Sequence, residues 1–301
     1  MSLRSLDPVA VKLTNGVVLH YVREGRRDAP TVIMIHGAMG DWRAWETQWD
    51  AFTGHFDCIS YSRRYSHPNP NALNTRDHSA IIDAEDLGLL MDALDVERAI
   101  LLGSSYGGFT ALAYAVQSPD RVSAVVSVEA PMMRYNEHHP DRLAVLRAFE
   151  QVSSEPARAL FESGADEQAI RVLTGGIVGQ PPEDVPDEVM KHRMINLRAA
   201  KSLAISNDEF PMLDRAKVAA LSMPVMLISG ADTAPVHAVT FKSVAEAMPQ
   251  AHTLIVSDAG HTVTRHQPDI FNTSVQAFLR DHGLSAPLAA ADGKAALTAQ
   301  R

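Results

Sequence analysis

Short apolar runs alternate with segments of helical length along most of this chain. The apolar runs cover residues 31–35, 58–61, 99–102, 122–128, 225–228 and 253–256. Unbroken runs of this length are typical of strands that are buried on both faces. The segments of helical length cover residues 42–52, 80–94, 107–117, 237–248 and 268–279. This order predicts an α/β fold in which a mostly parallel sheet has helices on both faces.

A hairpin is predicted at the start of the chain. Two β-prone runs, residues 8–13 and 17–22, are separated by Thr14, Asn15 and Gly16. Asn and Gly both tolerate positive φ, which the tight turn of a hairpin requires. We therefore expect two antiparallel strands before the first of the buried strands.

One stretch interrupts the alternation. From residue 131 to about 221 there is no convincing buried strand, whereas residues 142–149, 157–161, 168–173 and 189–200 have the pattern of short amphipathic helices. Prolines at positions 181, 182 and 186 favour helices that are joined by stiff turns. The expected domains are a core (residues 1–130 and 222–282), a helical insertion (131–221) and a disordered Ala-rich tail (283–301).

Composition excludes several classes of function. The 27 Lys and Arg residues are outnumbered by 36 Asp and Glu residues, and the formal net charge is −9. That charge repels phosphate backbones and anionic lipids, so we expect a small-molecule substrate and neither nucleic acid nor a membrane as partner. Cys58 is the single cysteine, and the first residues lack the apolar region of a secretion signal. Both features make the cytoplasm the expected location. The sequence leaves the oligomeric state open.

A G-x-S-x-G motif lies at the end of one predicted strand. Residues 103–107 (GSSYG) directly follow the apolar run 99–102 and precede a helical segment. At such a turn the glycines permit close approach of neighbouring backbone, and the central serine hydroxyl is raised above the sheet. Ser105 is therefore the candidate nucleophile, whereas Ser104 is one residue out of register.

With this motif the chain resembles the α/β-hydrolase family, in its serine-nucleophile branch with a helical cap, from about residue 8 to residue 282. Residues 36–40 (HGAMG) follow a buried run where the family has its oxyanion loop, and residues 259–261 (AGH) lie where it has its histidine loop. The resemblance implies that the backbone N–H groups of Ala38 and Tyr106 bind the oxyanion and that His261 is the general base. His36 is expected to shape its loop rather than to transfer protons.

Two residues compete for the role of the acid that orients His261. The family usually carries this acid after the strand matched by residues 225–228, where Asp232 stands one residue before the usual position and Thr233 occupies it. Glu129 directly follows the run 122–128, and certain haloalkane dehalogenases of the family take the acid from that loop. A carboxylate that closes a buried strand also needs a partner, because an unpaired buried charge is costly. This favours Glu129, with Asp232 as the alternative.

Four further side chains are candidates for the substrate pocket. Met132, Met133 and Tyr135 closely follow the favoured acid, and the two methionines indicate an apolar, adaptable wall. Trp42 begins a stripe of three tryptophans at helical spacing, which predicts a face packed against the core. Trp42 is also a candidate for the pocket wall.

Neither the adjacent arginines Arg63 and Arg64 nor the adjacent histidines in residues 137–140 indicate a cofactor. Arg63 and Arg64 stand where many family members have an Asp-x-Arg-Gly turn; pairing with Asp or Glu is the favoured role, and contact with an anionic substrate is the alternative. Residues 137–140 (EHHP) hold adjacent histidines, but neither an H-E-x-x-H motif nor a cysteine pair accompanies them. We therefore expect no metal, and the absence of a G-x-G-x-x-G fingerprint implies no nucleotide cofactor.

The resemblance implies hydrolysis of a carboxylic ester of a small or medium apolar substrate, through an acyl-enzyme on Ser105. The serine argues against haloalkane dehalogenase and epoxide hydrolase activity, because the enzymes of those kinds in the family have an aspartate at this position. Carbon-carbon hydrolase, lactonase, amidase and perhydrolase chemistry are alternatives on the same triad. A ligand receptor that has this fold and no catalytic activity is the alternative from another class.

Overall fold

The core of the protein is an eight-stranded sheet with the strand order β1-β2-β4-β3-β5-β6-β7-β8. The computed structural model describes residues 2–285. The strands are β1 (Val9–Lys12), β2 (Val18–Gly25), β3 (Thr31–Ile35), β4 (Asp57–Tyr61), β5 (Ala99–Ser104), β6 (Val122–Val128), β7 (Val225–Gly230) and β8 (His252–Val256). Strands β3 to β8 are parallel, whereas β2 pairs antiparallel with both β1 and β4. The predicted α/β fold with a mostly parallel sheet is confirmed.

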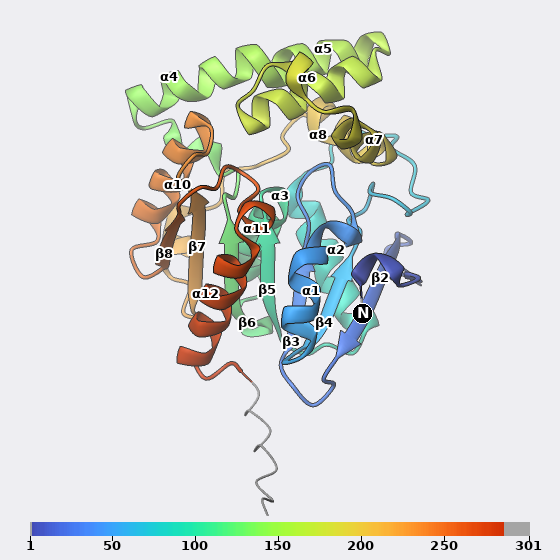
Figure 1. Ribbon diagram of the computed structural model, residues 1–301, viewed down its shortest axis with the longest axis vertical. Helices are drawn as coiled ribbons and strands as arrows, with labels where there is room; N and C mark the ends of the chain where they lie inside the picture. Colours follow the sequence, from blue (N-terminus) through green and yellow to red (C-terminus); the bar gives the residue numbers. More distant parts are fainter. Residues whose placement is uncertain (1, 286–301) are drawn as a thin grey trace, which may run out of the picture.

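Helices cover both faces of this sheet (Figure 1). The helices of the core are α1 (Glu46–Thr53), α2 (Ala80–Ala93), α3 (Tyr106–Gln117), α10 (Pro235–Ala247), α11 (Val263–His266) and α12 (Pro268–Asp281). Helices α2 and α3 pack together on one face, and α1 and α12 pack together on the other.

The side chains of each central strand alternate between two apolar cores, which is why the strand runs are apolar throughout. Ile33 and Leu101 are buried on the α2/α3 face, and Val32 and Ile100 are buried on the α1/α12 face. Burial of such side chains stabilises the fold by about 1.5 to 3 kcal/mol each. The tryptophan stripe that begins at Trp42 is buried in the core on the α1/α12 face, which confirms the predicted packing of that stripe.

Strands β1 and β2 form the predicted hairpin. Gly16 adopts a φ of 87°, and the side-chain oxygen of Asn15 accepts the N–H of Val17 at 3.1 Å. These are the two properties for which Asn-Gly is favoured in a tight turn. The hairpin extends the sheet at one edge, where β2 pairs with β4.

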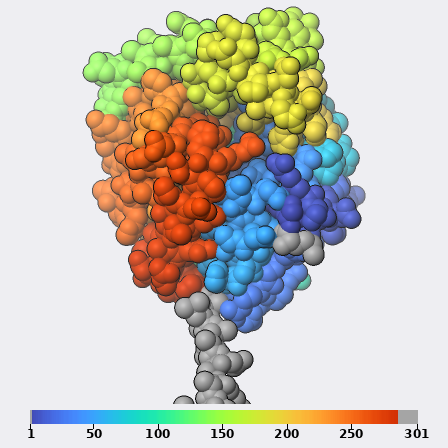
Figure 2. Space-filling view, in the orientation of Figure 1, coloured from blue at the N-terminus to red at the C-terminus, as the bar shows by residue number. Residues whose placement is uncertain are grey.

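Between β6 and β7 the chain forms helices and turns only. The helices are α4 (Pro140–Phe149), α5 (Glu155–Ser163), α6 (Asp166–Val178), α7 (Asp187–Ile195), α8 (Leu197–Ile205) and the short α9 (Arg215–Ala219). Helices α4 to α8 lie together across one end of the sheet, and Figure 2 shows them seated directly on the core. Helices α5 to α8 share an apolar cluster that includes Phe161, Ile170 and Met190 and that reaches the core through Met39, whereas α4 packs against α10.

The predicted C-terminal tail is described only at its start, because residues 286–301 lie outside the described residues. The N–H groups of Gly283 and Leu284 donate to carbonyl oxygens in the last turn of α12, each at 2.9 Å. Gly283 has a φ of 69°, as is usual for a glycine that ends a helix. Among residues 2–285 no helix has the length and apolar character that a bilayer span requires.

Candidate active site

Ser105 lies in a strained turn between β5 and α3. Its φ of 53° and ψ of −117° are values that residues other than glycine rarely adopt. The flanking glycines make the turn possible: a Cβ on Gly103 would lie 2.2 Å from the carbonyl oxygen of Gly107, and a Cβ on Gly107 would lie 2.0 Å from that of Ile35. The N–H of Ser105 donates to the carbonyl oxygen of Val128 at 2.7 Å, which holds the turn against the neighbouring strand.

Glu129 and His261 form a short contact between buried side chains. Nδ1 of His261 lies 2.6 Å from Oε2 of Glu129, and the hydroxyl of Thr233 donates to the same oxygen at 2.9 Å. Oε1 of Glu129 accepts from the hydroxyl of Ser229 at 2.7 Å and from the N–H of Gly230 at 3.0 Å. Burial alone would raise the pKa of Glu129, but the hydrogen bond and the charge of His261 lower it to about 2. An ionised acceptor at Nδ1 favours the tautomer that leaves Nε2 free to accept a proton.

The two candidate acids, Glu129 and Asp232, differ in their contacts and exposure. Glu129 follows β6 with a φ of 44°, and its N–H donates to the carbonyl oxygen of Ile228 at 3.0 Å. The Asp232 side chain is exposed, and within the described part of the chain it makes no hydrogen bond or ion pair with His261. Thr233, which stands at the family's usual position, donates to Glu129 instead.

A second histidine, His237 of α10, stacks on His261. The ring centroids are 4.0 Å apart and the ring planes differ by 20°. Nε2 of His237 lies 2.9 Å from the carbonyl oxygen of Ile177, so it donates to that oxygen. Burial and the neighbouring His261 lower the pKa of His237 to about 3, which keeps the ring neutral. No sequence motif points to His237, because only the fold brings α10 against the histidine loop.

His237, Glu129 and His261 are also the one group among the described residues that could hold a metal ion, since their ligand atoms lie within 4.8 Å of one another. The hydrogen bonds just described already engage Nδ1 of His261, Nε2 of His237 and both oxygens of Glu129. The protein itself therefore satisfies this cluster, and its donor set requires no cation.

The loop after β3 places Ala38 beside the nucleophile turn. Ala38, Ser105 and Tyr106 line the same cavity, and Tyr106 is the first residue of α3, so its N–H has no partner within that helix. Nδ1 of His36 donates to the carbonyl oxygen of the next residue at 2.7 Å, and its Nε2 accepts the N–H of Arg63 at 3.0 Å. Burial lowers the pKa of His36 to about 3. This neutral side chain therefore fixes the shape of the loop, as expected from the sequence.

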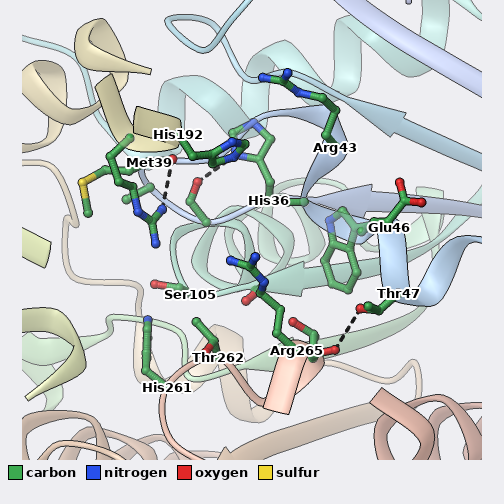
Figure 3. A pocket seen from close by; sticks show the side chains of 18 of the residues that line it. His36, Met39, Arg43, Glu46, Thr47, Ser105, His192, His261, Thr262 and Arg265 are labelled. Carbon is green, nitrogen blue, oxygen red and sulfur yellow. Dashed lines mark hydrogen bonds between the residues drawn. The ribbon is translucent and has the colours of Figure 1, made fainter. Parts of the chain in front are cut away.

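Ser105 borders two cavities at the end of the sheet that the helical insertion covers. The small cavity, of about 280 Å³, is also lined by His36 and His261, and Figure 3 shows its side chains. The large cavity, of about 700 Å³, extends along the insertion. Its apolar lining includes Met133, Leu146, Phe149, Leu173, Ile177 and Phe210.

Of the four predicted pocket residues, only Met133 lines a cavity that reaches Ser105. Met132 and Tyr135 are buried in the core on the α2/α3 face, where the Tyr135 hydroxyl donates to a backbone carbonyl oxygen at 2.9 Å. Trp42 is buried on the opposite face of the sheet. The expectation that these three residues shape the pocket is therefore wrong, because packing against the sheet turns their side chains away from it.

Arg63 and Arg64 have structural partners. Arg63 forms a buried ion pair with Asp83 at 2.6 Å, and Arg64 pairs with Asp86 at 2.7 Å. The favoured prediction for this pair of arginines is confirmed. Neither residue lines the two cavities beside Ser105.

Known proteins resemble this chain in sequence and in fold. A family model described as the alpha/beta hydrolase fold matches residues 30–172. A putative carbamate hydrolase, RutD, from a Caulobacter species is 28% identical over 263 residues, which are 84% of this chain and 91% of that protein. Carboxylesterase YbfK from Bacillus subtilis is 25% identical over 270 residues, which are 86% of this chain and 83% of that protein. The crystal structure of carboxylesterase CesB (YbfK) from Bacillus subtilis matches with a TM-score of 0.68 and 20% identity, over 92% of this chain and 93% of that one.

Proposed function

We propose that this chain, which belongs to the α/β-hydrolases and is a hydrolase, cleaves a carboxylic ester through an acyl-enzyme on Ser105. The observation that carries the proposal is the 2.6 Å contact between His261 and Glu129, beside a serine that is held in a strand-to-helix turn. A nucleophile, a base and an ionised group that orients the base are the parts that serine catalysis requires.

In the proposed mechanism His261 takes the proton of Ser105 while the serine oxygen attacks the ester carbonyl carbon. The oxyanion that forms accepts hydrogen bonds from the N–H groups of Ala38 and Tyr106, each of which contributes on the order of 3 kcal/mol to the transition state. The protonated His261 then donates to the leaving alcohol. In the second half His261 takes a proton from a water molecule that attacks the acyl carbonyl carbon, the bond to the Ser105 oxygen breaks, and His261 returns the proton to Ser105 as the carboxylic acid leaves. Glu129 holds Nδ1 of His261 throughout.

The large cavity supports a substrate with an apolar part of small or medium size. Its volume of about 700 Å³ and the aliphatic and phenyl side chains in its lining suit such a group, although the same lining also holds charged side chains such as Glu150 and Arg158. Similarity to a protein named carboxylesterase favours an ester over the other bonds that the same residues could cleave. In this proposal residues 131–221 act as a cap over a core formed by residues 1–130 and 222–282, and the substrate lies between them.

The test is hydrolysis of p-nitrophenyl esters from acetate to decanoate by the wild type and by the Ser105→Ala variant. We expect turnover by the wild type that is lost in the variant. The acyl chain length that gives the highest rate indicates how much of the large cavity the substrate fills. Labelling by a fluorophosphonate probe provides a second readout that does not depend on the choice of ester. A folded wild type that hydrolyses none of these esters and takes up no probe at Ser105 contradicts the proposal.

A further inference from the structure

The small cavity carries positive charge that the protein does not neutralise. The arginines that line it are Arg4, Arg43, Arg193 and Arg265. Arg43 pairs with Asp41 at 2.7 Å, and Arg4 lies 4.0 Å from Glu46, which is the single carboxylate among the described lining residues. Arg193 and Arg265 have no carboxylate partner anywhere in residues 2–285. Two guanidinium groups that line the cavity of Ser105 therefore have no carboxylate in contact: the partly buried Arg193, on which Asp41 acts only at longer range, and the exposed Arg265.

Arg193 is the more informative of the two. It stands near the end of α7 in the helical insertion, its side chain is partly buried, and Nη1 donates to the carbonyl oxygen of Met39 at 3.0 Å. That is one protein partner for a group with five N–H donors. Burial and the charge of Arg265 lower the pKa of Arg193 to about 10, so the group is still charged at neutral pH. Holding such a charge without a partner costs free energy that a bound anion would recover.

Other arginines of this protein are balanced in two ways. Arg63 and Arg64 have their aspartates at 2.6 and 2.7 Å, and Arg23 pairs with the buried Asp57 at 2.6 Å. Partly buried arginines whose hydrogen bonds go to backbone carbonyl oxygens are Arg158, Arg193, Arg198 and Arg215. Arg193 makes one such bond and lines the small cavity that also holds Ser105.

We infer that the small cavity is a carboxylate subsite, in which Arg193 and Arg265 bind an anionic group of the substrate while its ester carbonyl lies at Ser105. The planar fork of a guanidinium matches a carboxylate with two parallel hydrogen bonds. Figure 3 shows the Arg265 side chain extending from α11 toward the middle of the cavity. This inference rests on the proposed function and narrows it: the substrate is an ester with an apolar part on one side of the scissile bond and a carboxylate on the other.

Matched pairs of esters test the subsite. The first pair is the mono-4-nitrophenyl ester of glutaric acid and 4-nitrophenyl valerate, which place a carboxylate or a methyl group on the acyl side. The second pair is 4-carboxyphenyl butyrate and 4-methylphenyl butyrate, which do the same on the alcohol side. We expect the wild type to have a lower KM for the anionic ester in one pair. Equal KM values within both pairs overturn the inference.

Substitutions then assign the effect to residues. Arg193→Gln is expected to raise the KM for the preferred anionic ester about tenfold, as loss of a charge-assisted hydrogen bond does, and to change the KM for its neutral partner less than twofold. Arg265→Gln is expected to act in the same direction. Arg98→Gln is the matched control, because it removes the same charge from an exposed residue just before β5, at the opposite end of that strand from Ser105. An equal rise in KM for the neutral and the anionic ester in Arg193→Gln would show that Arg193 has a structural role only.

A binding measurement separates this inference from the proposed function. Titration calorimetry of glutarate with the Ser105→Ala variant is expected to show binding that Arg193→Gln, added to that variant, abolishes. Hydrolysis of neutral esters without glutarate binding overturns the subsite and leaves the serine hydrolase intact. Glutarate binding in a protein without Ser105-dependent turnover overturns the proposed function and leaves the subsite. Stronger binding of inorganic phosphate than of glutarate at equal ionic strength contradicts the carboxylate assignment.

Discussion

Replacing Glu129 with Gln removes one charge from the candidate triad and leaves its shape almost unchanged. Burial alone would raise the pKa of Glu129, but the hydrogen bond and the charge of His261 hold it well below its ordinary value. Removing the charged partner of a buried ion pair costs about 3 kcal/mol or more. If the imidazolium that forms in the transition state loses that interaction, kcat falls by about 100-fold or more.

The amide adds a second effect in the same direction. The side-chain NH₂ of Gln can donate to Nδ1 of His261, which favours the tautomer with its proton on Nε2. That tautomer cannot accept the proton of Ser105. We therefore expect a loss of at least two orders of magnitude in kcat, because the orientation and the charge of the ring both change.

The assay is kcat for the best p-nitrophenyl ester, with thermal unfolding measured on each variant to show that it folds. Asp232→Asn is the matched control, because it removes the same charge from an exposed loop residue near the site. We expect Asp232→Asn to retain at least half of the wild-type kcat. A folded Glu129→Gln variant with more than half of the wild-type kcat would show that Glu129 does not orient His261, and a hundredfold loss in Asp232→Asn would give that role to Asp232.

Three further predictions concern stability. Burial raises the pKa of Glu209 from 4.5 to about 7. Because this carboxyl group loses its proton at a lower pH in the unfolded chain than in the folded one, the free energy of unfolding falls by on the order of 3 kcal/mol as the pH rises from about 4.5 to 7. The Glu209→Gln variant is expected to lack this pH-dependent loss of stability, and urea unfolding of both proteins at pH 5 and pH 8 measures the difference. Gly107→Ala places a Cβ 2.0 Å from a backbone oxygen and is expected to lower the melting temperature strongly. In the control Gly54→Ala the new Cβ lies 3.8 Å from the nearest backbone oxygen and is expected to be tolerated, and calorimetry compares the two variants. Arg63→Met removes the guanidinium partner of the buried Asp83 and leaves it His78, at 3.3 Å, as its remaining cationic partner. We expect a loss of about 3 kcal/mol in urea unfolding, and an unchanged midpoint would contradict this.

The strands were predictable because burial on both faces leaves a local signal. The run 31–35 coincides with β3, and 122–128 coincides with β6, since each residue of such a strand meets an apolar core. The nucleophile turn was predictable for a similar reason. Its two glycines are required by contacts that any close strand-to-helix turn makes.

Features that depend on contacts between distant segments left no local signal. The predicted helix 189–200 is divided at Asn196, whose buried side chain accepts from the N–H of His67 at 2.9 Å and donates to Asp41 at 2.8 Å. The stacking of His237 on the histidine loop and the unpaired charge of Arg193 arise in the same way. Periodicity reports which face of an element is apolar, and it does not report which other element that face meets.

The proposed mechanism depends on acylation of Ser105. The most direct measurement is mass spectrometry of the protein quenched with acid during turnover of a p-nitrophenyl ester, followed by peptide mapping. We expect the added mass of the acyl group on Ser105 of the peptide that contains residues 103–107, and its disappearance in Ser105→Ala. Steady turnover with no acyl mass at any time, or with the acyl group on Ser104, would contradict this mechanism.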